Sequence, residues 1–230
     1  MVTGAGTFSL DGDRLRFPSS AFTLEGFRAW MHSPEVPEKL RATFVNGEVL
    51  VAMSPESIET HNKVKTAISA RLWQFVEDED LGEVYTDGVL FTHPDAQVST
   101  EPDFIFASWA TLQSGRLRKI ERVERTDEFK ELEGTPDLVV EVVSDSSTRK
   151  DLKLLRDAYA LAGIPEYWLV DARGDELRFE ILTLTPRGYT SQEPAAADTQ
   201  TSAVLGCSLA LRRVRNRVGG WRYLLDVIRS

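Results

Sequence analysis

The chain contains one cysteine, few histidines and no long apolar run. Because Cys207 stands alone, an internal disulfide and a cysteine-based zinc site are both excluded. No stretch is apolar over the length that a membrane-spanning helix needs, and the start, MVTGAGTFSLDGD, lacks the basic and then apolar layout of a signal peptide. We therefore expect a cytoplasmic protein with no membrane partner.

Positive charge is also scarce. The 230 residues include 27 Lys and Arg against 36 Asp and Glu, a formal net charge of -9. This balance argues against a protein that coats nucleic acid non-specifically, but it leaves room for a local basic cleft. The length is sufficient for one substantial hydrophobic core.

Helical and strand patterns alternate along the chain. Apolar spacings of three and four predict helices at 23–33, 54–79 and 148–163, the first capped by Thr23. Strands are predicted within 42–53, 82–93, 101–108, 135–144 and 166–172, the first range being a hairpin that turns at Asn46-Gly47. This order predicts an α/β fold with a mixed sheet.

The chain divides into three parts by composition. Residues 1–40 are expected to form an N-terminal arm and a short helix, and residues 41–185 the core. Residues 186–230 read as a C-terminal basic arm packed on the same domain, after a hairpin that turns near Pro186. The charged stretch from Trp109 to Glu133 reads as an irregular insertion.

Glu141 lies in the middle of an apolar run, TPDLVVEVVS. Side chains alternate along a strand, so Val139, Glu141 and Val143 share one face, and both faces are apolar enough for a central, covered strand. A buried carboxylate must be paired, hydrogen-bonded or bound to a cation, or else it is neutralised. A nearby arginine would satisfy it, and so would a metal ion.

A second carboxylate, Asp103, follows Pro102 in the strand EPDFIF. Carboxylates on two strands can hold Mg²⁺, which keeps several waters, and a neighbouring lysine could orient water or neutralise charge. Lys150 and Lys153 lie at the start of the following helix. Alternatively, Asp103 is a capping or turn residue, while Asp137 is expected to be a structural residue at the entry of its strand.

Other polar and aromatic residues have ordinary interpretations. Without further information, His61 reads as a surface or capping residue, and His32 and His93 as surface residues. Tyr167 and Trp168 are expected in the core. The last basic segment could be a phosphate-binding stripe, a solvated arm or a dimer contact, and its arginines are Arg212, Arg213, Arg215 and Arg217.

Four motifs together point to a known family: NGEVLVAMSPE followed by His61, EPDFIF, GTPDLVVEVVSDSS and RDAYALAGIPEYWLVD. From about Phe44 to Asp171 the chain resembles the Uma-type "putative restriction endonucleases" of the PD-(D/E)XK nuclease superfamily. The resemblance implies a restriction-endonuclease-like mixed β-sheet core flanked by helices, with extra β-hairpins.

By this resemblance, Asp103 and Glu141 match the two acidic elements of the superfamily motif, and Glu48 and His61 match further polar positions. The usual motif lysine is absent, since Val143 stands two residues after Glu141. The position from which a helix lysine serves in this family is occupied by Leu155. Lys150 and Lys153 are the nearest substitutes, although residues 153 and 155 are about 200° apart on a regular helix.

The expected function is metal-dependent endonucleolytic hydrolysis of DNA. The resemblance implies that Asp103, Glu141 and Glu48 hold Mg²⁺ or Mn²⁺, that Lys153 or Lys150 lies near the attacking water, and that His61 supports the site. A non-catalytic nucleic-acid-binding or interaction domain is the alternative, and a hydrolase of small phosphate substrates is a third possibility. We expect a homodimer, with WRYLLDVI and the hairpin near Ile181 as candidate contacts.

Overall fold

The computed structural model describes residues 6–10, 13–37, 40–52, 55–122, 125–145, 147–191 and 199–229. Residues 1–5 of the expected N-terminal arm lie outside this range, as do residues 123–124 of the expected insertion. None of the described helices is long and apolar enough to cross a lipid bilayer.

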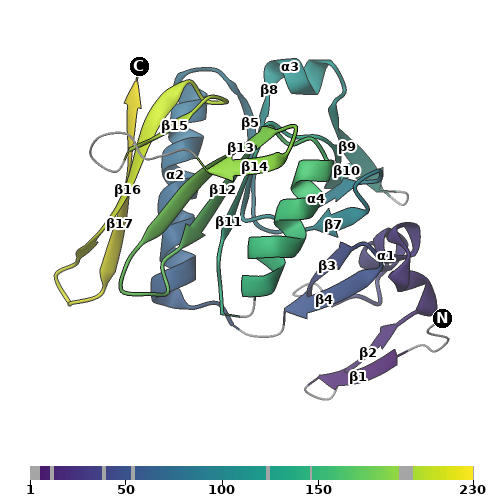
Figure 1. The fold of residues 1–230 in the computed structure, drawn as a ribbon. Helices are drawn as coiled ribbons and strands as arrows, with labels where there is room; N and C mark the ends of the chain where they lie inside the picture. The colour runs from purple at the N-terminus through teal and green to yellow at the C-terminus, as the bar shows by residue number, and fades with distance from the viewer. Residues whose placement is uncertain are drawn as a thin grey trace.

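Two six-stranded mixed sheets make up the body of the protein (Figure 1). The first, which we call the central sheet, has the order β14 (Gly188–Ser191), β13 (Arg178–Thr185), β12 (Glu166–Asp171), β11 (Leu138–Val142), β8 (Phe104–Ser108) and β5 (Gly82–Thr86). The second has the order β4 (Glu48–Ala52), β3 (Arg41–Val45), β7 (Val98–Thr100), β6 (Leu90–His93), β10 (Arg125–Gly134) and β9 (Leu117–Arg122). The prediction of an α/β fold with a mixed sheet, flanking helices and extra hairpins is confirmed.

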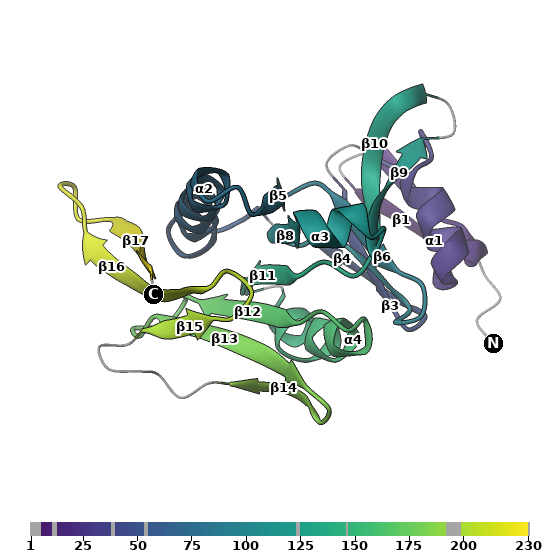
Figure 2. The same cartoon turned by 90° about the horizontal axis from the view of Figure 1, so that it is seen from above.

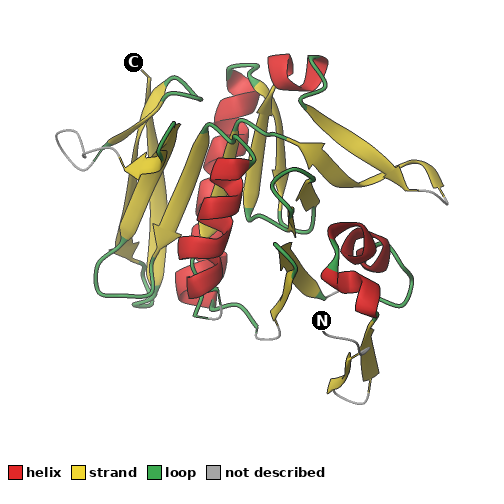
Figure 3. Cartoon of the chain, turned by 45° about the vertical axis from the view of Figure 1, so that its right-hand side comes forward, coloured by secondary structure: helices red, strands yellow, loops and turns green. Residues whose placement is uncertain are grey.

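Two helices cover opposite faces of the central sheet (Figure 2). The long helix α2 (Lys63–Asp78) runs alongside the strands (Figure 3) and packs on the face that carries Leu138 and Val140. The predicted apolar stripe of this helix is confirmed, since the residues that it buries include Val64, Ile68, Leu72 and Phe75.

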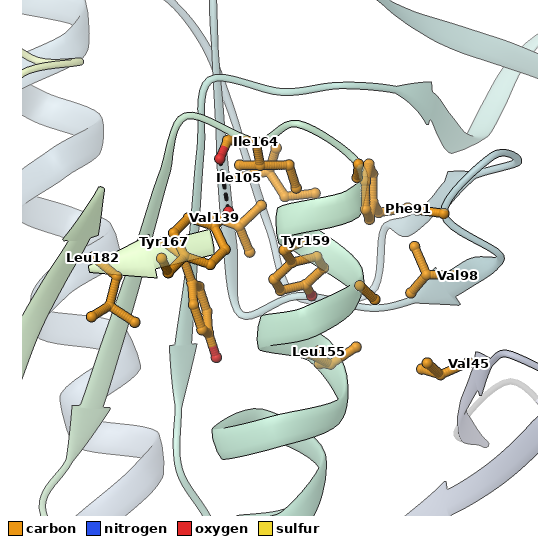
Figure 4. Close-up of a cluster of buried hydrophobic side chains, with 14 of the residues drawn as sticks. Val45, Phe91, Val98, Ile105, Val139, Leu155, Tyr159, Ile164, Tyr167 and Leu182 are labelled. Carbon is orange, nitrogen blue, oxygen red and sulfur yellow. Dashed lines mark hydrogen bonds between the residues drawn. The ribbon is translucent and has the colours of Figure 1, made fainter. Parts of the chain in front are cut away.

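The other face of β11 is covered by the π-helical turn Lys150–Leu155 and the helix α4 (Arg156–Leu161) that continues it. Leu155 and Tyr159 belong here to one buried cluster with Val139 (Figure 4), which also includes Val143. Strand β11 is therefore buried on both faces, as its sequence predicts. Tyr167 and Trp168 on the neighbouring strand are fully buried, which confirms them as core aromatics.

The two short helices α1 and α3 each begin at a residue whose side chain caps the helix. Helix α1 (Leu24–Met31) is capped as predicted, with Thr23 Oγ1 accepting the Gly26 N–H at 3.2 Å. The helix α3 (Trp109–Gln113) begins at the cap Ser108. Asp137 accepts hydrogen bonds from the Ser108 N–H at 2.7 Å and the Thr111 hydroxyl at 2.9 Å, so it is the structural residue that its position predicts.

The expectation of an irregular insertion at 109–133 is wrong. After α3 the chain forms the antiparallel pair β9–β10, and β10 also pairs in parallel with β6. Leu117 and Leu132 are buried, while Glu131 and Glu133 are bound by Arg28. The strand was hidden because the charged Glu131 takes a buried position, where Arg28 and His32 bind it, so the polar and apolar residues do not alternate with burial.

The two terminal arms are ordered hairpins. Strands β1 (Gly6–Leu10) and β2 (Asp13–Phe17) pair at the N-terminal end. The C-terminal segment forms a three-stranded sheet of β15 (Gln200–Ser202), β16 (Cys207–Arg215) and β17 (Trp221–Arg229). Its inner face buries Leu209, Tyr223 and Leu225 against α2.

Two smaller expectations also change. Ile181, expected at a dimer contact, is fully buried within the protomer and cannot present its side chain to a partner. His32 is not simply a surface residue, because its Nε2 lies 2.9 Å from Oε2 of the buried Glu131. His93 is half-buried, and burial lowers its pKa.

Candidate active site

Asp103 and Glu141 meet at the end of the pairing between β8 and β11. The antiparallel register places Phe104 opposite Val140, so Asp103 comes next to Glu141. Asp103 Oδ2 accepts the backbone N–H of Val142 at 2.7 Å, which extends the strand pairing through a side chain. Asp103 lies two residues before Ile105, and Glu141 lies two residues after Val139. Side chains two positions apart on a strand point to the same face, and Ile105 and Val139 pack on the face that α4 covers. The two carboxylates therefore share one face of the sheet.

Burial makes negative charge costly at both carboxylates. Glu141 is 2% exposed, and burial together with the nearby Asp151 and Asp103 raises its pKa to about 8, against the opposing charge of Lys150. Burial also raises the pKa of Asp103, although Lys65 and His61 oppose the shift. Two carboxylates that are destabilised in this way attract any cation that can reach them.

Glu141 is held between a lysine and a tyrosine. The Tyr159 hydroxyl donates to Glu141 Oε1 at 2.7 Å, and Lys150 Nζ lies 3.8 Å from Oε2. Lys150 also pairs with Asp151 at 2.9 Å. Although burial alone would lower it, these carboxylates raise the pKa of Lys150, which stays protonated at neutral pH. No arginine is within ion-pairing distance of Glu141 among the described residues, so the arginine alternative is wrong.

Asp103 has cationic partners of its own, which the sequence reading missed. Lys65 Nζ on α2 lies 3.4 Å from Asp103 Oδ1 and 2.7 Å from Glu56 Oε1. Its side chain is only 9% exposed, and its pKa is raised by Asp103 and Glu56 against the effect of burial. A signal was present, because Lys65 lies three residues before Ile68 and seven before Leu72, on the apolar stripe.

His61 belongs to the same cluster. Its Nε2 lies 3.7 Å from Asp103 Oδ2, and its Nδ1 lies 3.1 Å from Glu56 Oε2 without the geometry of a hydrogen bond. It is 5% exposed, so the interpretation as a surface histidine is wrong. Burial would raise the pKa of Glu56, but Lys65 and His61 bring it down to about 2. Glu56 is therefore ionised and available to hold Lys65 in place.

These groups surround a cleft of about 1180 Å³. It lies between β3 and β4 on one side and the segment from the end of β11 to the π-helical turn on the other. A cavity of this size admits a phosphate group with its neighbouring sugars and water. The polar residues of its lining include Asp87, Glu101, Asp103, Glu141, Lys150 and Asp151.

Other expected site residues lie elsewhere. Glu48 is 43% exposed in its side chain and pairs with Arg149 at 3.0 Å. Lys153 is exposed and lines a separate hollow with Arg156 and Tyr189. Leu155 is 0% exposed in the core (Figure 4). The structure therefore brings Lys150, and not Lys153, to Glu141.

The donor set fits a hard cation with few protein ligands. Among the described residues, no group of three or more His, Cys, Asp or Glu side chains is arranged to hold a metal ion. Asp103 and Glu141 supply two buried carboxylates that face a water-accessible cleft. Mg²⁺ is commonly bound by one or two carboxylates with several retained waters, so these two residues suit it.

The mixed sheet with its paired carboxylates defines a protein of the nuclease-fold class. A solved structure of similar fold, "a putative nuclease belonging to DUF820" from Anabaena variabilis, has a TM-score of 0.51 at 15% identity, over 80% of this chain and 90% of that chain. The family model of Uma2, described as "Putative restriction endonuclease", matches residues 24–212. The chain belongs to the Uma2 family. The comparison with curated proteins gave no match.

Proposed function

We propose that this protein is a metal-dependent endonuclease that hydrolyses phosphodiester bonds in DNA. The observation that carries the proposal is the meeting of two buried carboxylates, Asp103 and Glu141, on one face of the sheet at a wide cleft. Membership of a nuclease family supports it. Asp103 and Glu141 would hold Mg²⁺ or Mn²⁺, which when bound lowers the pKa of a water and stabilises charge on a phosphate.

The chain's own residues have separate roles in this proposal. Lys150 stays protonated, so it acts through its charge on the phosphate oxygens and not as a general base. Lys65 favours the ionised form of Asp103, as a metal ligand requires. Tyr159 orients Glu141 by donating to Oε1, and Oε2, which lies 3.8 Å from Lys150 Nζ, would be the oxygen offered to the cation.

One observation favours a non-catalytic protein as the second candidate. Each carboxylate already has a lysine nearby, Lys65 at 3.4 Å from Asp103 and Lys150 at 3.8 Å from Glu141. An internal ammonium group can satisfy a buried carboxylate without any metal. On this view the cleft would be a nucleic-acid-binding or interaction site that keeps the nuclease fold.

Metal binding separates the two candidates. Calorimetric titration with Mn²⁺ should show binding to the wild type that weakens at least about 10-fold in Asp103→Asn and Glu141→Gln, because each removes a charged ligand. Glu77→Gln, an exposed carboxylate change on α2, is the matched control and should bind like the wild type. Absence of binding to the folded wild type would favour the non-catalytic candidate.

Cleavage of plasmid DNA tests the reaction itself. Lys150→Met should reduce the rate about 100- to 1,000-fold, as removal of a positioned charge typically does. Lys153→Met, in the separate hollow, should leave the rate within about twofold, and EDTA should abolish cleavage. The proposal fails on this substrate if wild type and Glu141→Gln are both indistinguishable from buffer with Mg²⁺ and with Mn²⁺. Hydrolysis of small phosphodiesters alone would point to the third class of function.

A further inference from the structure

The hairpin of β16 and β17 ends in a strongly basic tip. Residues 212–222 contain five arginines and no acidic residue, in a chain whose formal net charge is -9. Such a segment in an acidic protein must either pair its charges internally or present them to an anionic partner.

Two of the five arginines are used within the fold. Arg212 forms an ion pair with Asp226 across the hairpin at 2.7 Å. Arg213 donates to the carbonyl of Ala172 at 3.2 Å and to that of Gly174 at 2.9 Å, in the loop that follows β12. These two side chains fasten the hairpin to itself and to the loop after β12.

The other three define what we call the arginine tip: Arg215, Arg217 and Arg222, all exposed. No carboxylate among the described residues lies within ion-pairing distance of any of them, although the charge of Arg215 helps to lower the pKa of the nearby Glu59. The Arg215 guanidinium lies 3.5 Å from the centroid of the Trp221 ring and donates to the Gly219 carbonyl at 2.9 Å. Stacking restrains its orientation and so reduces the entropy that binding would cost.

The hairpin that carries the arginine tip is joined by hydrogen bonds to two segments next to the cleft. Glu59 Oε2 accepts the backbone N–H of Trp221 at 2.6 Å, and Glu59 precedes the cleft residue His61 by two positions, at most about 7 Å between Cα atoms. The second connection is indirect: Arg213 binds the loop after β12, Arg173 in that loop donates to Thr148, and the Thr148 hydroxyl donates to the carbonyl of the cleft residue Ser144 at 3.2 Å. Figure 1 shows the tip at the end of the molecule where α2 begins.

We propose that the arginine tip binds the phosphate backbone of duplex DNA on one side of the scissile phosphate. The inference rests on the proposed function and deepens it. Guanidinium groups match phosphate geometry in a bidentate manner, and three of them close to the cleft add positive charge that no carboxylate within ion-pairing distance offsets among the described residues. The contact between Glu59 and Trp221 keeps the tip closer to His61 than the length of one helical turn of DNA, about 34 Å. One duplex can therefore contact the tip and the cleft at the same time.

The experiment measures the affinity of a fluorescein-labelled duplex by anisotropy, in EDTA and from about 50 to 200 mM salt. Each lost phosphate contact lowers the slope of log K against log salt by about 0.9, so Arg217→Gln/Arg222→Gln should lower it by about 2. Arg118→Gln/Arg187→Gln removes the same charge from exposed sites elsewhere and should keep the wild-type slope. Thermal melting should confirm that both variants are folded.

The binding assay contains no metal and is therefore independent of cleavage. If the wild type does not bind the duplex, or if the tip variant has the wild-type slope, the inference is overturned. Equal slope losses in the tip and control variants would also overturn it, because they would show a general charge effect. If binding depends on the tip but Mg²⁺ gives no cleavage, the arginine tip is supported and the nuclease proposal fails. If the wild type cleaves DNA but the tip variant binds it normally, the nuclease proposal is supported and the inference about the tip fails.

Discussion

The stability of Glu141→Gln relative to the wild type should rise with pH in the metal-free protein. The ordinary glutamate pKa near 4.5 holds in the unfolded chain, whereas burial raises the pKa of Glu141 to about 8 in the fold. The folded state therefore binds the proton more tightly, and the stability it gains from the neutral carboxyl is lost as the pH rises from the lower to the higher value. Gln has the same shape, remains neutral and can still accept the Tyr159 hydroxyl.

The magnitude follows from linkage. Each pH unit in this interval costs the wild type about 1.4 kcal/mol, and the cost levels off near pH 8, so the change between pH 6 and 8 is about 2 kcal/mol. Glu141→Gln also loses the contact with Lys150, which lowers its stability by a similar amount at every pH. The difference in unfolding free energy between variant and wild type is therefore offset by a constant, but it still changes with pH.

The assay is urea denaturation in EDTA at several pH values, for wild type and Glu141→Gln. Glu77→Gln, on the exposed face of α2, is the matched control, and it should stay within about 0.5 kcal/mol of the wild type throughout. A difference between wild type and Glu141→Gln that does not change between pH 6 and 8 would refute the reasoning. It would show that Glu141 is already ionised in the fold and paired with Lys150.

Two further predictions concern the core and assembly. Leu155→Ala should lower the free energy of unfolding by about 2–5 kcal/mol, because Leu155 is 0% exposed, while Leu161→Ala, at 70% exposed, should change it by less than about 0.5 kcal/mol in chemical denaturation. We still expect a homodimer, now through the outward face of the C-terminal sheet around Ile228, at the end of the hairpin away from the arginine tip, and a monomer mass by light scattering at micromolar concentration would contradict this.

Local sequence was enough to predict the covered strand and the elements around it. Period-two alternation in TPDLVVEVVS, with both faces apolar, is a direct consequence of strand geometry, and it correctly located β11 in the core. The apolar stripe of α2 and the Thr23 cap were predicted for the same reason, since each depends on residues within a few positions of one another. The match of Asp103 and Glu141 to a family motif pointed to the cleft that they now line.

The choice of lysine could not be made from spacing. The sequence argument assumed a regular helix, on which residues 153 and 155 point in different directions. In the structure, Lys150–Leu155 form a π-helical turn, whose wider winding changes the direction of each side chain. Lys150 reaches Glu141, and Lys153 lies at the surface.

The sequence by itself determined the class of fold, the buried carboxylate pair and membership of the Uma2 family, because these depend on local periodicity and on a motif. Only the tertiary structure decided which cations surround the pair. Lys65 precedes Asp103 by 38 positions and Lys150 follows Glu141 by nine, and both reach the site because α2 and the π-helical turn close on the same end of the sheet. No local pattern encodes that meeting, since it is set by the packing of two apolar helix faces on opposite sides of one strand.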